Sequence, residues 1–166
     1  PIGSKLGILG GGQLGRMLSL AAAKLGYKTH VFDTLADCPG MQVSDESTVA
    51  DFSNMEALEK FALSCDVVTY EFENIPLLVA EKIALKVPLV PGVMPLAISQ
   101  DRLNEKEFLF KNSISVAPFF LVRNIADLQE GFNKIGFPCV LKSRRMGYDG
   151  KGQTTFTSIE EIQLSG

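Results

Sequence analysis

A short apolar run that breaks into glycines decides the fold: Leu6 to Leu18 reads LGILGGGQLGRML. Its first four residues have the length and composition of a buried strand. Gly10, Gly12 and Gly15 follow at the spacing Gly-x-Gly-x-x-Gly, and apolar residues then recur at helical spacing until Gly26, which is placed to end the helix. The stretch therefore predicts a strand, a tight turn and a helix.

Strand and helix patterns continue to alternate after this unit. Further strands are predicted at Thr29 to Phe32, at Val67 to Tyr70 and at Leu89-Val90, which lies between two prolines. Between them, Asn54 is placed to cap one helix, and Pro76 can sit in the first turn of another. Such alternation predicts an α/β fold, an open parallel sheet with helices on both faces, whose ligands lie beyond the carboxyl ends of the strands.

A second domain is expected to follow the first, with residues 1–96 forming one and residues 97–166 the linker helix and the beginning of the other. Its first predicted elements are a long helix, clearest from Asp101 to Phe110, and a strand from Phe119 to Val122. A helix capped by Asn124 and ended by Gly136 follows, and then a strand from Val140 to Lys142. Residues Gln153 to Phe156 are predicted to return as an antiparallel strand, and Ile159 to Leu164 to begin a helix. Too little sequence remains to close this second core, so a fragment of a longer protein is expected.

Composition narrows the class of protein. A net charge of -3 with 16 Lys and Arg provides no basic field for nucleic acid or for an anionic membrane surface. No apolar run approaches the ~20 residues that span a bilayer. The three cysteines are widely spaced, which indicates reduced thiols in the cytoplasm rather than disulfides or a zinc site. The single histidine, His30, is predicted to be a structural strand residue.

The glycine turn allows two interpretations. With a strand before it, a helix after it and Asp33 at the end of the next strand, it fits a dinucleotide-binding turn, and NAD binding by a dehydrogenase is one hypothesis. The same turn can also serve only to pack strand against helix. The spacing alone does not separate these alternatives.

Acidic residues follow the predicted strand at Tyr70. Period-two alternation would place Glu71 and Glu73 on the same side, where they could bind a cationic or hydrogen-bond-donating group. Solvated charges are the alternative, and Asn74 could be only a cap before Pro76.

The richest segment is Lys142 to Gln153, KSRRMGYDGKGQ. A strand lysine offers a point charge to a phosphate, and the three glycines that follow let backbone close over the remaining phosphate oxygens. The segment lacks the Gly-Lys-Ser or Gly-Lys-Thr ending of a Walker A loop. It predicts a polyphosphate site, with a solvated surface hairpin as the alternative.

Four segments in order resemble those of the 5-(carboxyamino)imidazole ribonucleotide synthases, which are ATP-grasp ligases of purine biosynthesis. They are GGGQLGRM at residues 10–17, EFENIP at 71–76, QDR at 100–102 and GYDGKGQ at 147–153. The resemblance covers residues 6 to 153. It implies a Rossmann-like pre-ATP-grasp domain followed by the beginning of an ATP-grasp domain, and a reaction in which ATP and bicarbonate carboxylate 5-aminoimidazole ribonucleotide through carboxyphosphate.

Site residues carried over from that resemblance fall into two groups. The ATP contacts it implies are Arg102, Lys142, Gly147, Tyr148, Asp149, Gly150, Lys151, Gly152 and Gln153. The contacts to the imidazole nucleotide it implies are Gly12, Gln13, Leu14, Glu73, Tyr148, Asp149 and Lys151.

The resemblance also implies a metal cofactor and an oligomeric state. The resemblance implies Mg²⁺ as cofactor, with its ligands expected downstream of residue 166 and no metal site within this fragment, which alone is expected to be inactive. It also suggests a homodimer. Another ATP-grasp ligase with a different acceptor, a dehydrogenase fragment and a noncatalytic binding module remain alternatives.

Overall fold

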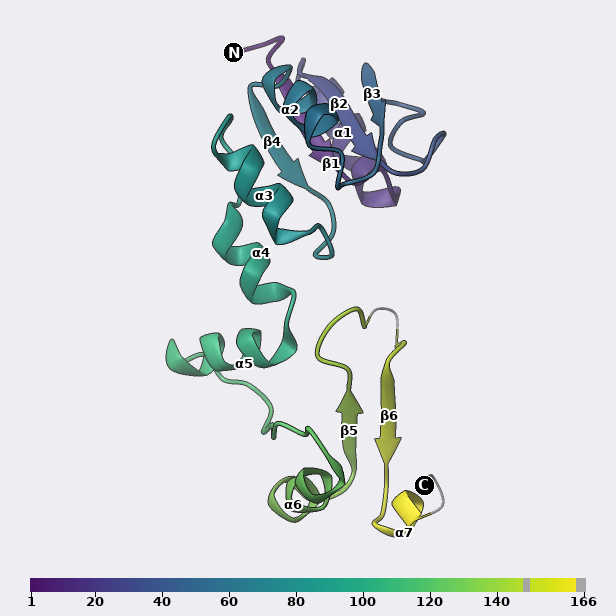
Figure 1. Cartoon of the computed structure of the whole chain (residues 1–166), viewed down its shortest axis with the longest axis vertical. Coiled ribbons are helices and arrows are strands. Elements are labelled where there is room, and N and C mark those ends of the chain that lie inside the picture. The colour runs from purple at the N-terminus through teal and green to yellow at the C-terminus, as the bar shows by residue number, and fades with distance from the viewer. Residues whose placement is uncertain (148–149, 164–166) are drawn as a thin grey trace. The chain divides into compact units, whose positions relative to one another are not determined.

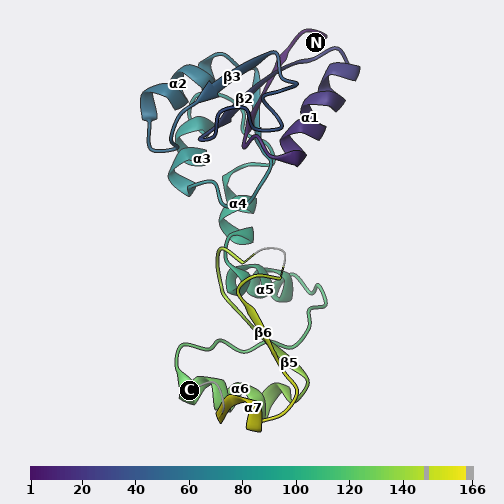
Figure 2. The same ribbon diagram turned by 90° about the vertical axis from the view of Figure 1, so that its right-hand side faces the viewer.

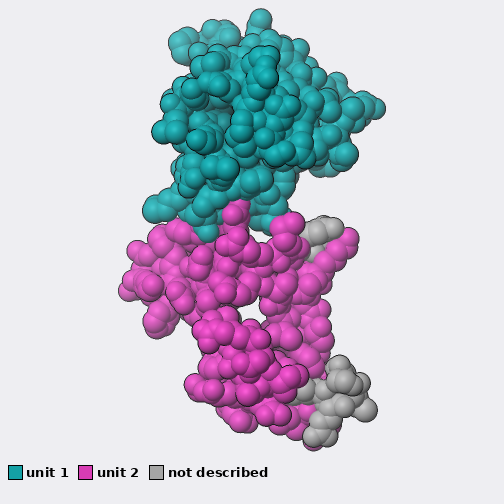
Figure 3. Space-filling view, in the orientation of Figure 1, with its two compact units in different colours: residues 1–97 teal, residues 98–166 magenta. Residues whose placement is uncertain are grey.

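A computed structural model describes residues 1–147 and 150–163 of the chain (Figure 1). They form two compact units, Pro1–Ala97 and Ile98–Gly166, coloured separately in Figure 3. Within the described ranges, no helix has the length and apolar character needed to cross a membrane.

A four-stranded parallel sheet forms the centre of the first unit. Its strands are β1 (Lys5–Leu9), β2 (Lys28–Asp33), β3 (Glu46–Val49) and β4 (Val67–Tyr70), in the order β3-β2-β1-β4. The predicted parallel sheet is confirmed. Strand β3 was not predicted, because its sequence, ESTV, is mostly polar and exposed at the sheet edge and so lacks the apolar pattern of a buried strand.

Helices cover both faces of this sheet, as predicted. Figure 2 shows α1 (Gln13–Lys24) on one side and α2 (Met55–Leu63) with α3 (Leu77–Ala84) on the other. Asn54 caps α2 by accepting a hydrogen bond from the Ala57 N–H at 3.0 Å. Pro76 stands at the cap of α3, one residue before the first turn in which it was predicted.

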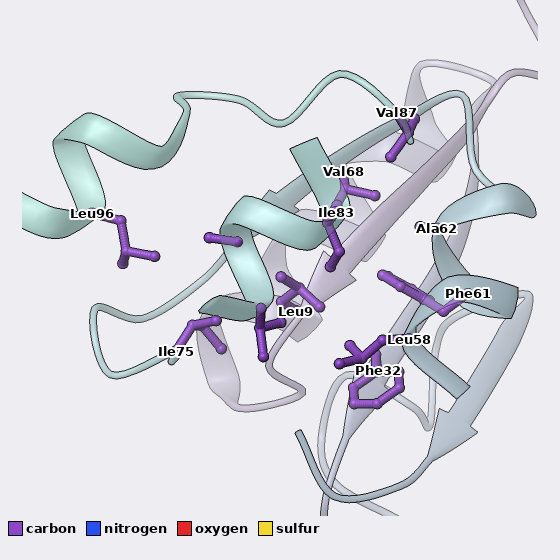
Figure 4. Close-up of a cluster of buried hydrophobic side chains, with 12 residues drawn as sticks. Leu9, Phe32, Leu58, Phe61, Ala62, Val68, Ile75, Ile83, Val87 and Leu96 are labelled. Carbon is purple, nitrogen blue, oxygen red and sulfur yellow. The ribbon is translucent and has the colours of Figure 1, made fainter. Parts of the chain in front are cut away.

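The main core of the first unit lies between the sheet and helices α2 and α3 (Figure 4). Leu9 and Phe32 point into it from neighbouring strands, Phe61 from α2, and Ile83 from α3, and each is at most 1% exposed. Burying each such side chain contributes roughly 1.5–3 kcal/mol. The preceding residues of the two strands, Ile8 and Val31, belong to a separate small cluster with Cys38, as the alternation of side chains along a strand requires.

The second unit is built around a hairpin. It contains α5 (Arg102–Lys111), α6 (Ile125–Ile135), β5 (Cys139–Lys142), β6 (Gln153–Phe156) and α7 (Glu160–Gln163). Strands β5 and β6 pair antiparallel, with Lys142 opposite Gln153, as the sequence predicted. Asn124 caps α6 and Gly136 follows it with a φ of 82°, which confirms both predicted helix boundaries.

Three predictions of local structure were wrong. Residues 119–122 form no strand, because strand-forming side chains alone do not supply a partner for the backbone, and this segment lines a pocket instead. Leu89-Val90 makes only an isolated parallel bridge, between Leu89 and Val68. The long helix is divided into α4 (Val93–Ser99) and α5, since Asp101 is extended and caps the second helix.

Candidate functional site

Three strand ends converge on the glycine turn of the first unit. Strand β1 lies between β2 and β4, with Leu9 opposite Phe32 on one side and Tyr70 on the other. The residues after these strands therefore flank the turn. Asp33 accepts a hydrogen bond from the Gly11 N–H at 2.6 Å, and Glu71 accepts one from the Gly12 N–H at 3.1 Å.

The amino end of α1 therefore already has an anion beside it. A dinucleotide-binding turn keeps this position, where the strand order reverses, for a pyrophosphate, whereas here the Glu71 carboxylate occupies it. Burial raises the pKa of Glu71, and the opposing hydrogen bonds from the Gly12 and Gly15 amides do not cancel that rise. A methyl group on Gly12 would lie 2.9 Å from Glu71 Oε1, so the turn is also closely packed. This geometry favours the packing interpretation of the turn over NAD binding.

The residues expected to contact the imidazole nucleotide lie near the same sheet edge. Gln13 and Leu14 begin α1 and are exposed, and Gly12 is partly buried before them. Glu73 is exposed in the turn after β4. The argument from period-two alternation was wrong, because the strand ends at Tyr70, before both glutamates. Glu71 is hydrogen-bonded to the glycine turn, whereas Glu73 is exposed to solvent.

A pocket of about 600 Å³ lies within the second unit. Its lining is mainly apolar, with Phe119, Phe120 and Phe132 among its residues, and it includes two cations that were expected to bind ATP, Arg102 and Lys142. Apolar walls with a few charged groups are typical of sites for nucleotides and other small molecules. The structure thus brings together, in one hollow, residues that are 40 positions apart in the sequence.

A second hollow of about 460 Å³ lies on the hairpin side of Lys142. Its lining contains two more of the expected ATP contacts, Gly152 and Gln153, together with Ser143, which follows Lys142. Lys142 lines both hollows, because it is the last residue of β5 and precedes the glycine-rich loop. Val122, Leu128 and Leu141 line both hollows as well, and Lys142 is the charged residue among these four.

The glycine-rich loop is closed at its base. The Ser143 N–H donates to the Gly152 carbonyl at 2.7 Å, and the Arg102 guanidinium donates to the Gly147 carbonyl at 3.2 Å. Gly150 and Gly152 have φ angles of 78° and 70°, a conformation that favours glycine. Lys151 lies between them, whereas Tyr148 and Asp149 are outside the described residues, so their expected roles are not addressed by the geometry.

Asp101 was not singled out as a site residue, yet its carboxylate accepts hydrogen bonds from two arginine side chains. It is 3% exposed and accepts hydrogen bonds from Arg144 Nη2 at 2.7 Å and from Arg145 Nε at 3.2 Å. It also caps α5 through the Leu103 and Asn104 N–H groups. An aspartate before a helix indicates a cap in the sequence, but its arginine partners lie 43 and 44 residues away and give no local signal.

Other candidate chemistry in the described residues is limited. No group of three or more His, Cys, Asp or Glu side chains in the described ranges is placed to hold a metal ion. His30 is buried in β2, with one ring nitrogen 2.8 Å from Ser64 Oγ and the other 2.8 Å from Thr48 Oγ1. Burial lowers the pKa of His30. These contacts agree with the structural role predicted for it.

Comparison with known protein families separates the dehydrogenase alternative from the ATP-grasp alternatives. The model of the ribonucleotide synthetase preATP-grasp domain matches residues 4–100, more than half of the chain. The chain belongs to this family. The ATP-grasp domain model matches residues 107–165. This family assignment replaces the dehydrogenase hypothesis for the glycine turn.

Three relatives illustrate what this chain is similar to. N5-carboxyaminoimidazole ribonucleotide synthase of Brucella melitensis is 45% identical over 97% of the chain, which covers 44% of that protein. The ADP complex of N5-carboxyaminoimidazole synthetase from Staphylococcus aureus has a TM-score of 0.93 at 38% identity, over 99% of this chain and 44% of that one. The Aspergillus clavatus synthase, in complex with ADP and 5-aminoimidazole ribonucleotide, has a TM-score of 0.85 at 33% identity, over 99% and 43%. The chain thus spans under half the length of these relatives.

Proposed function

We propose that this chain contributes the nucleotide-binding parts of an ATP-dependent carbon–nitrogen ligase of purine biosynthesis. The reaction joins bicarbonate to the exocyclic amine of 5-aminoimidazole ribonucleotide. ATP phosphorylates bicarbonate to carboxyphosphate with release of ADP, and the amine then takes the carboxyl group and releases phosphate. The observation that carries the proposal is the shared pocket of Arg102 and Lys142 in a unit that matches the ATP-grasp model. The named relatives support the same reaction.

The two units would divide the work. In the second unit, Lys142 would offer a point charge to the phosphates, Arg102 would approach the nucleotide from the start of α5, and the loop from Gly147 to Gln153 would close over the reacting end. The apolar part of the pocket would take the base. Such a closable cationic loop also protects a short-lived acyl phosphate from water.

In the first unit, the imidazole nucleotide would lie near the carboxyl edge of the sheet. Gly12, Gln13 and Leu14 would form the floor of this site, and Glu73 would accept hydrogen bonds from donor groups of the ligand. Tyr148, Asp149 and Lys151 are further residues proposed, from the sequence resemblance, to contact the imidazole nucleotide. Mg²⁺, when bound, neutralises phosphate charge, and its ligands are expected outside residues 1–166. A cytoplasmic location and a homodimer complete the proposal.

A coupled assay tests this function directly. ADP release should require both bicarbonate and 5-aminoimidazole ribonucleotide in the full-length protein that carries this chain, and the carbamate should appear in equal amount. Formate replaces bicarbonate in a parallel assay, because a formate-activating ATP-grasp ligase is the second candidate. ADP release with formate, or with an acceptor other than the imidazole nucleotide, would overturn the proposed substrate assignment.

A further inference from the structure

The amino end of α5 and the start of the glycine-rich loop are held together by one buried carboxylate. Asp101 receives two hydrogen bonds from Arg144, Nε at 3.1 Å and Nη2 at 2.7 Å, and a third from Arg145 Nε at 3.2 Å. The Asp101 side chain is 4% exposed, whereas those of Arg144 and Arg145 are 48% and 60% exposed. The carboxylate is thus the fixed centre, and the guanidinium groups converge on it from the loop.

Arg102, the residue after Asp101, makes two further hydrogen bonds to the same segment. Its backbone N–H donates to the Arg144 carbonyl at 2.9 Å, and its guanidinium donates to the Gly147 carbonyl at 3.2 Å. Arg102 is therefore hydrogen-bonded to both ends of the segment 144–147, with which the glycine-rich loop begins. Arg102 and Arg144 also line the apolar pocket together with Lys142.

The charges show which cations are already engaged. Burial opposes ionisation of Asp101, but hydrogen bonds from Arg144, Arg145 and the Asn104 and Leu103 amides outweigh it and hold its pKa below the ordinary value. An ionised carboxylate in that environment is stable only while its donors stay in place. Arg144 and Arg145 thus pair with the Asp101 carboxylate inside the protein. Lys142, rather than these two arginines, is therefore the residue that we assign to phosphate.

We propose that Asp101 is a positioning residue of the nucleotide site, which fixes residues 144–147 against the start of α5 and thereby orients Arg102 toward the pocket. This rests on the proposed ATP site for its functional consequence. The geometric part, the attachment of the loop to α5, stands on contacts within the second unit alone.

Amide hydrogen exchange tests the attachment without any nucleotide. In Asp101→Asn, exchange at the Arg102 and Ser143 amides should accelerate by about tenfold or more, because both amides donate to carbonyls of the anchored loop. Arg145→Gln removes one donor only and serves as the milder variant if Asp101→Asn unfolds. Asn54→Ala, which removes the cap of α2 in the other unit, is the matched control and should leave both amides unchanged. Unchanged exchange at the Arg102 and Ser143 amides in both Asp101→Asn and Arg145→Gln overturns the proposal.

ATP affinity, measured by calorimetry in the full-length protein, tests the orientation of Arg102. Asp101→Asn should raise the Kd for ATP about tenfold, the scale of one lost charged hydrogen bond. In an Arg102→Ala background the same change should add less than about threefold, because the residue through which Asp101 acts is gone. If Asp101→Asn raises the Kd for ATP by the same factor in the parent and in Arg102→Ala, the role of Asp101 is merely structural and the proposal is overturned. Failure of the parent to bind ATP sinks the proposed function instead, and the exchange experiment then decides the attachment alone.

Discussion

Glu71 Oε1 accepts a hydrogen bond from the Gly12 N–H at 3.1 Å, so a carboxyl group of the protein itself lies against the glycine turn. The relationship joins the ends of two adjacent strands, β1 and β4. It explains how a turn with dinucleotide-binding spacing can belong to a family with another function. Two predictions depend on it directly.

Glu71→Gln should change how stability depends on pH. Burial places the pKa of Glu71 above its ordinary value of 4.5, so the carboxyl of the folded protein keeps its proton to a higher pH than that of the unfolded chain. Its contribution to stability is complete below that ordinary value and is lost as the pH rises through the raised pKa. The free energy of unfolding of Glu71→Gln minus that of the parent should therefore increase as the pH rises from the ordinary value of 4.5 through the raised pKa. Urea titrations at several pH values measure it. Glu73→Gln, exposed in the same turn, is the control, and an equal pH trend in both variants would contradict the prediction.

Nucleotide preference should follow the occupied turn. NADH should not bind, because its pyrophosphate would have to displace the Glu71 carboxylate and approach Asp33 as well. ATP should bind through the other unit. Titration of NADH fluorescence, with an ATP titration of the same sample, compares the two. Saturable NADH binding that survives excess ATP would restore the dinucleotide interpretation.

Lys142→Met should weaken ATP binding and leave the fold intact. Lys142 is exposed at the end of β5 and lines both hollows, so the change removes a charge while little packing is lost. The Kd for ATP should rise roughly 10- to 100-fold, the range for a hydrogen bond to a charged group. Lys111→Met is the matched control, since Lys111 is exposed and pairs with Glu107 in the same helix. Calorimetry with both variants gives the comparison, and equal affinities would remove Lys142 from the site.

Asp149→Ala should lower turnover with 5-aminoimidazole ribonucleotide by roughly 10² in the full-length enzyme, the scale of a lost positioning contact. The prediction comes from the sequence, in which a carboxylate between glycines can accept hydrogen bonds from an amine or hydroxyl but would repel triphosphate. ATP affinity should stay nearly constant. Steady-state kinetics with each substrate varied in turn provide the measurement. Normal turnover, or a loss confined to ATP affinity, would assign Asp149 to loop structure instead.

Local signals made much of the fold predictable. The glycine turn, the Asn54 and Asn124 caps and the β5–β6 hairpin depend on residues close in sequence, and all were found where predicted. Strand β3 was missed because its ladder partner, β2, makes the strand, while its own residues are polar. The expected strand at residues 119–122 failed for the converse reason, since its side chains favour a strand but its backbone has no ladder.

The candidate site was predictable in type but not in its connections. Lys142 and the glycines after it predicted a polyphosphate site from charge and backbone freedom. The sequence could not show that Glu71 rather than Glu73 would meet the glycine turn, because this depends on where β4 ends. Nor could it pair Asp101 with Arg144, because that contact arises only when the hairpin folds back over 43 residues.

The bridge between Val68 and Leu89 has a consequence for the solubility of the first unit. Val68 donates to the Pro88 carbonyl at 2.9 Å and accepts from the Val90 N–H at 2.9 Å, so its outward backbone groups are satisfied. Pro88 and Pro91 flank this segment and have no N–H to offer a further strand. A neighbouring molecule therefore cannot extend the sheet past β4 by strand addition unless it first displaces the proline-flanked segment, which protects this edge against aggregation.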